Sequence, residues 1–310
     1  MKFSSERLYP GDIVEVKAPD EILQTLDVDG TLDHMPFMPE MVEFCGKRFR
    51  VSRRALKTCI YGPVIGMLGF STDDILVLDD LRCSGAAHDG CEKSCTIFWR
   101  EAWLRKVDDP GVQSNTDGTG HQRLRSRLKT STGPATYFCQ ASELLKVARP
   151  LSHWERFGTC IDEVRVRNCS AFEMAQRIGI WLLWRIRRIV LGEYAHGTQK
   201  TTPVESLNLQ PGESVEVKSI DNIRDSLNGT ARNRGLRFFP NMRLLCGSRS
   251  RVRNRLDKII VDGTGEMRQL HNTVYLEGSM CGCAHVAFGG CPRNEFAYWR
   301  EIWLRRQADT

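Results

Sequence analysis

The sequence lacks long apolar segments and the common motifs of catalysis. Its longest apolar stretch, from Ile178 to Trp184, is far shorter than the roughly 20 residues of a membrane-spanning helix. It has no P-loop, no G-x-G-x-x-G after a predicted strand, no H-E-x-x-H and no G-x-S-x-G. These absences favour a protein that binds rather than one that catalyses, although they leave an unfamiliar enzyme open.

Targeting signals and a strong charge of one sign are also missing. The first residues, MKFSSERLYPGD, have neither the apolar core nor the cleavage site of a secretory signal, so we expect a cytoplasmic location. The net charge of +6 is small for 310 residues and is spread along the chain. It permits contact with nucleic acid or an anionic membrane but requires neither. In a reducing compartment, the 12 cysteines are expected to be metal ligands or redox groups rather than structural disulfides.

The first and last thirds of the sequence repeat one another in order. The matching positions of the two copies include Leu8, Pro10, Gly11, Val14–Lys17, Phe37, Pro39, Met41, Cys45, Arg54, Trp99–Glu101 and Trp103–Arg105 against Leu209, Pro211, Gly212, Val215–Lys218, Phe238, Pro240, Met242, Cys246, Arg255, Trp299–Glu301 and Trp303–Arg305. A repeat of this kind predicts two copies of one structural unit. We therefore expect a first module at 1–106, a linker at 107–134, a helical connector at 135–196 and a second module at 197–310.

Each module contains several short strand patterns bounded by turns. They are IVEVK, RFRVS and ILVLDDL in the first copy, and SVEVK, KIIVDG and TVYLEG in the second. These patterns predict a mainly β protein with a helical connector, built from two small SH3-like or partly open β-barrels related by internal duplication. The Trp-rich end of each module fits a strand or a short helix, and its tryptophans are expected to fill the barrel core.

Cysteine and histidine cluster at matching places in the two copies. Cys83, Cys91 and Cys95 form a C-x7-C-x3-C pattern around His88, with Cys45 earlier in the module. The second copy offers Cys246, Cys281, Cys283, His285 and Cys291. Cys83 pairs with Cys281 or with Cys283, depending on where a two-residue gap is placed.

Zinc is the metal that these residues favour. Structural zinc takes four ligands, usually cysteine thiolates with up to two histidines, often from two places in the chain. The first copy can supply four sulfurs, and the second three sulfurs plus Cys283 or His285. We predict two zinc sites; an iron–sulfur cluster, which also uses thiolates, is the less favoured alternative. The cysteines without a matching partner, Cys59, Cys139, Cys160 and Cys169, fit buried thiols better. A catalytic pair of Cys91 and His88 is weakly supported, since no third group is evident.

Two basic regions have alternative interpretations. The helix pattern from Ile178 to Leu191 combines arginines with Trp181 and Trp184, which suits a membrane-surface helix or a docking helix. A core helix with arginines reaching to solvent is the preferred explanation. The strands RFRVSRR and SRSRVRNR contain no aromatics for base stacking, so nucleic-acid binding is weakly supported.

The segments FMPEMVEFCGKRFRVSRRALKTC, LVLDDLRCSGAAHDGCEKSCTIFWREAWLRK, YFCQASELLK, LNLQPGESVEVKS and YWREIWLRR resemble an uncharacterised family of two-module, cysteine-rich bacterial proteins, some encoded in biosynthetic gene neighbourhoods. The resemblance implies no activity, and it implies that the family's cysteine and histidine positions are Cys45, Cys83, His88, Cys91, Cys95, Cys246, Cys281, His285 and Cys291. Cys283 and the longer loop from Cys281 to Cys291 depart from that pattern. We therefore expect a non-catalytic, zinc-stabilised binding or scaffold protein whose partner is another protein. A metalloenzyme or iron–sulfur electron carrier in a biosynthetic pathway is the alternative.

Overall fold

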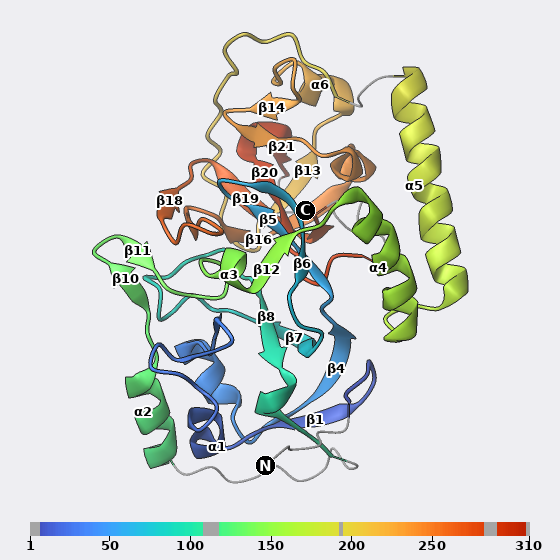
Figure 1. Ribbon diagram of the computed structural model, residues 1–310. Coiled ribbons are helices and arrows are strands. Elements are labelled where there is room, and N and C mark those ends of the chain that lie inside the picture. Colours follow the sequence, from blue (N-terminus) through green and yellow to red (C-terminus); the bar gives the residue numbers. More distant parts are fainter. Residues whose placement is uncertain (1–6, 108–117, 192–194, 282–289, 308–310) are drawn as a thin grey trace. The chain divides into compact units, whose positions relative to one another are not determined.

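The computed structural model describes residues 7–107, 118–191, 195–281 and 290–307, which fall into two compact units (Figure 1). Unit 1 comprises Met1–Ala175, Ile260–Arg268 and Ala287–Arg293. Unit 2 comprises Gln176–Ile259, Gln269–Val286 and Asn294–Thr310. Two short segments from late in the sequence therefore belong to the first unit.

The main sheet of unit 1 has five antiparallel strands in the order β8-β7-β4-β1-β9. Its strands are β1 (Ile13–Val16), β4 (Arg48–Arg54), β7 (Ile75–Arg82), β8 (Thr96–Arg100) and β9 (Leu104–Lys106). Only the three-residue 3-10 turn η2 (Glu101–Trp103) separates β8 from β9, yet these strands form opposite edges of the sheet. The sheet therefore curls, so that its two edges approach one another.

Aromatic side chains fill the inside of this curl. Trp99 and Trp103 are fully buried, and Phe37 packs edge-on against both, with ring centroids 6.2 and 5.1 Å away. Edge-to-face packing of this kind stabilises a core beyond the area it buries. The prediction that the tryptophans fill the core is confirmed.

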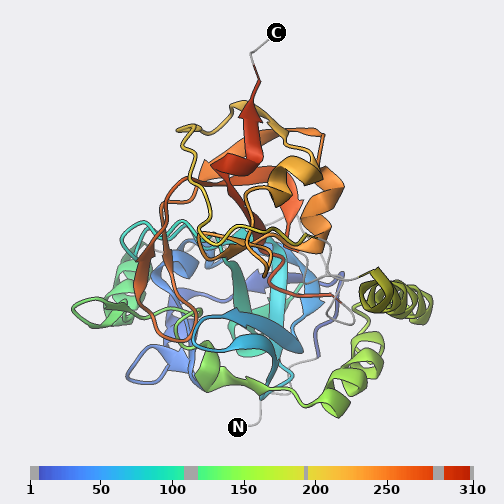
Figure 2. The ribbon, with the colours of Figure 1, turned by 90° about the horizontal axis from the view of Figure 1, so that it is seen from above.

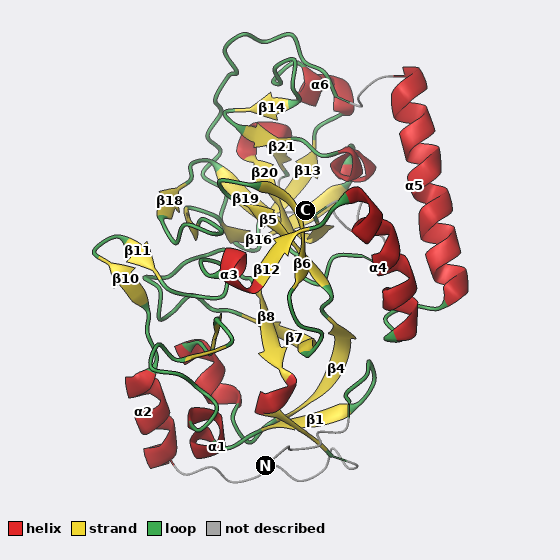
Figure 3. Ribbon diagram, viewed as in Figure 1, coloured by secondary structure: helices red, strands yellow, loops and turns green. Residues whose placement is uncertain are grey.

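A smaller sheet and several short elements complete unit 1 (Figure 3). The small sheet has the order β12-β6-β5. The remaining elements are α1 (Pro19–Leu23), β2 (Thr31–Leu32), β3 (Met35–Pro36), η1 (Pro39–Phe44), β5 (Lys57–Tyr61), β6 (Ile65–Phe70), α2 (Gly118–Arg127), β10 (Ser131–Gly133), β11 (Thr136–Tyr137), α3 (Leu144–Val147), β12 (Ala148–Pro150) and α4 (His153–Arg165).

Unit 2 has a main sheet with the same strand order, β20-β19-β16-β13-β21. Its strands are β13 (Ser214–Val217), β16 (Arg249–Arg255), β19 (Thr273–Met280), β20 (Phe296–Arg300) and β21 (Leu304–Arg306). The other elements are α6 (Ile220–Arg224), β14 (Arg232–Asn233), β15 (Leu236–Arg237), η3 (Pro240–Leu245) and η4 (Glu301–Trp303). The paired strands β17 (Lys258–Ile260) and β18 (Met267–Gln269) cross the boundary between the units along the chain.

The same polar contact anchors the start of each module. In unit 1, Arg54 donates to Glu101 and to the carbonyl of Leu8, whose own N–H donates to Glu101. In unit 2, Arg255 donates to Glu301 and to the carbonyl of Leu209, whose N–H again donates to the glutamate. The glutamate of the Trp-Arg-Glu motif thus ties the first segment of each module to the turn between its last two strands.

The prediction of a mainly β protein with two similar β modules is confirmed. The predicted strands correspond to β1, β4, β7, β13, β17 and β19, and the Trp-rich ends contain both a strand and a 3-10 turn. The predicted boundaries at 106, 134 and 196 do not coincide with those of the units. The predicted linker contains α2, and its residues 108–117 lie outside the described part.

The longest helix is α5 (Ala171–Leu191), a single uninterrupted rod (Figures 1 and 2). A capping box begins the helix: the N–H of Glu173 donates to Ser170 Oγ, and the N–H of Ser170 donates to the Glu173 carboxylate. Among the helices in the described residues, none is long and apolar enough to cross a membrane.

Candidate metal centre

Glu40 lies in the first turn of η1, directly after Pro39. Proline is well suited to this position because its fixed backbone angle matches the helix and its missing N–H would have no partner there. The short helix begins next to the buried residues Phe37 and Met38, and it directs the Glu40 side chain inward. Only 4% of that side chain is exposed, which is unusual for a carboxylate.

Cys83 follows the end of β7, and His88 lies in the tight turn that comes next. The N–H of His88 donates to the carbonyl of Gly85, and the N–H of Cys91 donates to the carbonyl of His88. Gly85 has a φ of +70°, and a Cβ there would lie 2.0 Å from the carbonyl oxygen of Cys91. Because only glycine fits, this residue sets the path of the loop that carries His88.

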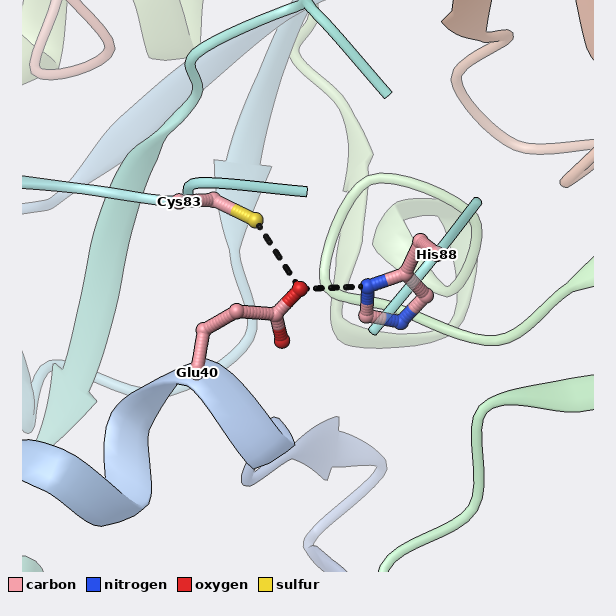
Figure 4. Close-up of side chains that lie close together, drawn as sticks. All are labelled: Glu40, Cys83 and His88. Atoms are coloured by element: carbon pink, nitrogen blue, oxygen red, sulfur yellow. Dashed lines mark hydrogen bonds and ion pairs between the residues drawn. The ribbon is translucent and has the colours of Figure 1, made fainter. Parts of the chain in front are cut away.

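Glu40, Cys83 and His88 converge on one point (Figure 4). His88 Nδ1 lies 2.8 Å from Glu40 Oε1, and Cys83 Sγ lies 3.7 Å from the same oxygen. The potential ligand atoms of the three residues all lie within 4.8 Å of one another. Carboxylate oxygen, thiolate sulfur and imidazole nitrogen are the three ligand types that zinc uses in proteins.

The other ring nitrogen of His88 is held by the backbone. Nε2 lies 3.0 Å from the carbonyl oxygen of Phe138, so it carries a proton and donates it. Ligating histidines usually anchor their second nitrogen in this way, which fixes the ring and leaves the first nitrogen for the metal. The arrangement points Nδ1 of His88 toward Glu40 and Cys83.

Burial and mutual contact shift the pKa values of all three residues. Burial acts to lower the pKa of His88, but the hydrogen bond and charge of Glu40 and the Phe138 carbonyl outweigh it, so the pKa is raised. Burial acts to raise the pKa of Glu40, but the hydrogen bond and charge of His88, with the N–H of Ala87, outweigh it and lower that pKa. Burial, reinforced by the charge of Glu40, raises the pKa of Cys83 well above its ordinary value. A thiol in this state is a poor nucleophile.

Glu40 Oε2 has no hydrogen-bond partner among the described residues, although it is fully buried. An unpartnered buried carboxylate oxygen is costly, since it has given up its hydration without a replacement. A cation bound between Glu40, Cys83 and His88 would provide that replacement. This oxygen is the clearest sign that the three residues form a site.

The other predicted ligands of the first module are Cys45, Cys91 and Cys95. Their sulfurs do not belong to the group of ligand atoms that lie within 4.8 Å of one another. Cys45 is buried after η1, where burial raises its pKa to about 12. Cys91 Sγ accepts the N–H of Ile260 at 3.3 Å, and Cys95 Sγ accepts a hydrogen bond from Arg293 at 3.8 Å. The structure thus unites Cys83 and His88 with Glu40, which the sequence did not single out.

The predicted ligands of the second module are divided between the units. Cys246 and Cys281 belong to unit 2, whereas Cys291 belongs to unit 1. There its thiol donates to the sulfur of Cys59 at 3.5 Å, and both side chains are buried. Cys283 and His285 lie outside the described residues.

Unit 1 also contains a buried ion cluster near these cysteines. The Asp262 carboxylate accepts hydrogen bonds from Lys93 and, at 2.8 and 3.1 Å, from Arg293, and all three side chains are almost fully buried. Burial acts to raise the pKa of Asp262, but these two cations outweigh it and hold that pKa far below its usual range. One buried carboxylate thus joins two basic side chains, which suits a structural anchor.

No protein-family model, curated protein or solved structure matches the chain. The chemistry of Glu40, Cys83 and His88 therefore carries the interpretation. Comparison of the two copies does not reveal Glu40, because the matching residue of the second copy is Asn241, which is not a typical metal ligand. The signal that could have found it is an acidic residue inside an otherwise apolar, proline-led segment, FMPEMVEF.

Proposed function

We propose that the protein is a zinc-stabilised, non-catalytic binding or scaffold protein built from two SH3-like modules that arose by duplication. The metal would be held in unit 1 by Cys83 Sγ, His88 Nδ1 and both oxygens of Glu40, which makes four ligand atoms from three residues. The buried and unpartnered Glu40 Oε2 supports this proposal most directly. Ligand atoms of three types within 4.8 Å fit zinc better than an iron–sulfur cluster, which needs several thiolates.

Duplication and the SH3-like form are supported by the strand order. In each unit, the fifth strand pairs with the first, and a 3-10 turn joins it to the fourth. The Arg-Glu-Leu contact recurs with the same atoms at positions that match in the sequence repeat. Two related modules in one chain would double the surface offered to a protein partner. The resemblance to two-module bacterial proteins makes a biosynthetic enzyme a reasonable partner to test.

Elemental analysis of anaerobically purified variants tests the site. We expect zinc to be lost in Glu40→Gln and Cys83→Ser and retained in Cys45→Ser and in Asn241→Ala, the matched change in unit 2. Loss of zinc in Cys45→Ser and Cys95→Ser with retention in Glu40→Gln would instead identify a four-thiolate site. Brown protein that contains iron would rule out zinc as the resident metal.

A metalloenzyme is the second candidate, because three protein ligands are the usual number at a catalytic zinc with an open position. Cobalt substitution separates the two candidates, since the visible spectrum of cobalt reports changes in coordination. If azide leaves the spectrum unchanged, the position is closed and the structural role holds. If azide alters the spectrum in wild type but not in Glu40→Gln, an open position exists and the catalytic role gains support.

A further inference from the structure

Helix α5 exposes an apolar stripe to solvent, formed by one residue near its start and five in its last three turns. At 100° per residue these side chains fall within an arc of about 120°, which is a single helix face. The large side chains of this stripe and their exposed fractions are Phe172 (72%), Leu182 (45%), Leu183 (68%), Ile186 (57%), Ile189 (76%) and Val190 (72%). Such exposure does not fit the core helix that the sequence favoured, and a patch of this kind marks an interaction surface.

The helix also carries a net positive charge. The segment 171–191 contains four arginines and a single acidic residue, Glu173, which is occupied in the capping box. Arg185 and Arg187 stand one position before and after Ile186, so they leave the helix about 100° to either side of that residue. The apolar stripe is therefore flanked by cations on both sides.

This combination restricts what can cover the stripe. A second copy of α5 would bury the apolar residues but would bring the flanking arginines of the two helices together, with no acidic residue beyond Glu173 to offset them. A surface that is apolar inside and negative at its edge satisfies both parts of the helix. The headgroup region of an anionic bilayer has this composition, and amphipathic helices with basic flanks bind it in its plane.

We propose that α5 is a membrane-surface helix that binds anionic lipid, with its apolar stripe inserted at the headgroup boundary. At 21 residues the helix is about 32 Å long, which is long enough for the whole stripe to lie in the interface. Arg185 and Arg187 pair with lipid phosphate and carboxylate groups beside the stripe. The inference rests on α5 alone and is independent of the metal site.

Sedimentation with vesicles of phosphatidylcholine, with and without phosphatidylserine, tests the proposal. We expect the full-length protein to bind the anionic vesicles, to bind neutral ones much more weakly and to dissociate as salt is raised. The double change Leu183→Asp with Ile186→Asp should weaken binding by about tenfold or more, since it removes the inserted apolar side chains. The double change Arg185→Gln with Arg187→Gln, which leaves the stripe intact, should weaken binding by about fivefold for each arginine.

The matched control is Val204→Asp with Leu244→Asp, which alters two equally exposed apolar residues elsewhere in unit 2. It should bind anionic vesicles as wild type does. Absence of binding to anionic vesicles, or binding that both α5 variants leave unchanged, would overturn the proposal. A wild-type dimer that Leu183→Asp with Ile186→Asp converts to a monomer, without vesicle binding, would assign the stripe to a second copy instead.

Discussion

The two main sheets agree strand by strand, whereas the loops that carry the cysteines do not. Both sheets have the same order, and in both the N–H of the first loop cysteine donates to the residue twelve or fourteen positions on: Cys83 to the carbonyl of Cys95 at 2.8 Å, Cys281 to that of Glu295 at 2.7 Å. The ligand residues differ, however. Glu40 corresponds to Asn241, which donates to the carbonyl of Met280.

The difference separates what the fold requires from what the site requires. The buried tryptophans and the Arg-Glu-Leu contact occur in both units, because either sheet needs them to close. The carboxylate occurs only in unit 1, so it serves something other than the sheet. Four comparisons between the units test this division, and they are given in order of expected effect.

Disrupting the buried ion cluster of unit 1 should lower the free energy of unfolding more than any other change proposed for the two units. Asp262→Asn removes the buried carboxylate that Lys93 and Arg293 share, and we expect the free energy of unfolding to fall by about 3–5 kcal/mol. In unit 2, Asp257→Asn removes the partly exposed partner of Arg255 and should cost at most about 1 kcal/mol. Urea unfolding at neutral pH measures both costs. If the two variants lost the same free energy of unfolding, burial of the Asp262 ion pairs would not explain their contribution.

Asp262→Asn should also change how the stability of the protein depends on pH in the acid range. The pKa of Asp262 is lowered in the folded state, so its contribution to stability is present above its unfolded value of about 3.8 and is lost as pH falls toward the folded pKa. Wild type should therefore lose this part of its stability only below about pH 3.8, and Asp262→Asn should lack that part at every pH. Parallel acid titrations followed by circular dichroism would reveal it.

The second largest difference is expected between Arg54 and Arg255, the matched arginines of the two modules, in how much each contributes to stability. Arg54 is almost fully buried, and among the described residues Glu101 keeps the N–H of Leu8 as its one backbone donor without it, whereas Glu301 keeps three such donors without Arg255. We expect Arg54→Met to cost about 3 kcal/mol and Arg255→Met about 1 kcal/mol in urea unfolding. A larger loss for Arg255→Met would show that the two contacts are not used as described.

Zinc bound by Glu40, Cys83 and His88 should stabilise unit 1. At free zinc about 100-fold above its dissociation constant, wild type should gain roughly 2.7 kcal/mol over the metal-free form. Glu40→Gln should gain little, and Asn241→Ala should gain as much as wild type. Thermal unfolding with and without chelator measures this, and a full gain in Glu40→Gln would remove that residue from the site.

The first tryptophans of the two Trp-Arg-Glu motifs should give the smallest difference. Trp299 Nε1 donates to Ser279 Oγ at 2.7 Å, whereas Trp99 Nε1 has no partner among the described residues. Changing each to phenylalanine removes similar volume, but only Trp299→Phe also breaks a hydrogen bond and leaves a buried hydroxyl unsatisfied. Trp299→Phe should therefore cost about 1 kcal/mol more than Trp99→Phe in urea unfolding.

Much of the framework could be predicted because it depends on local patterns. Local apolar patterns predicted β1, β4 and β7 of the first main sheet and β13, β16 and β19 of the second. The small sheet was missed: β5 and β6 pair locally, whereas β12 joins β6 from about 80 positions away, which no local pattern reveals. The position of Cys291 beside Cys59 was missed for the same reason, because no spacing reveals that a late segment packs into unit 1.

The candidate site was predicted only in part. Cys83 and His88 were found because cysteine and histidine recur at matching places, while Glu40 was hidden by its replacement in the second copy. The four-sulfur grouping assumed that matching cysteines converge on one ion. In unit 1, the sulfurs of Cys91 and Cys95 lie outside the group of ligand atoms within 4.8 Å, and they accept hydrogen bonds from the N–H of Ile260 and from Arg293.

X-ray absorption at the zinc edge tests the central claim most directly. The protein would be loaded with zinc and would carry Cys246→Ser, Cys281→Ser, Cys283→Ser, His285→Ala and Cys291→Ser, so that none of the predicted ligands of the second module remains. The account predicts a coordination shell with one sulfur at about 2.3 Å and nitrogen and oxygen at about 2.0–2.2 Å, lost in Glu40→Gln. A shell of three or four sulfurs that survives Glu40→Gln would contradict it.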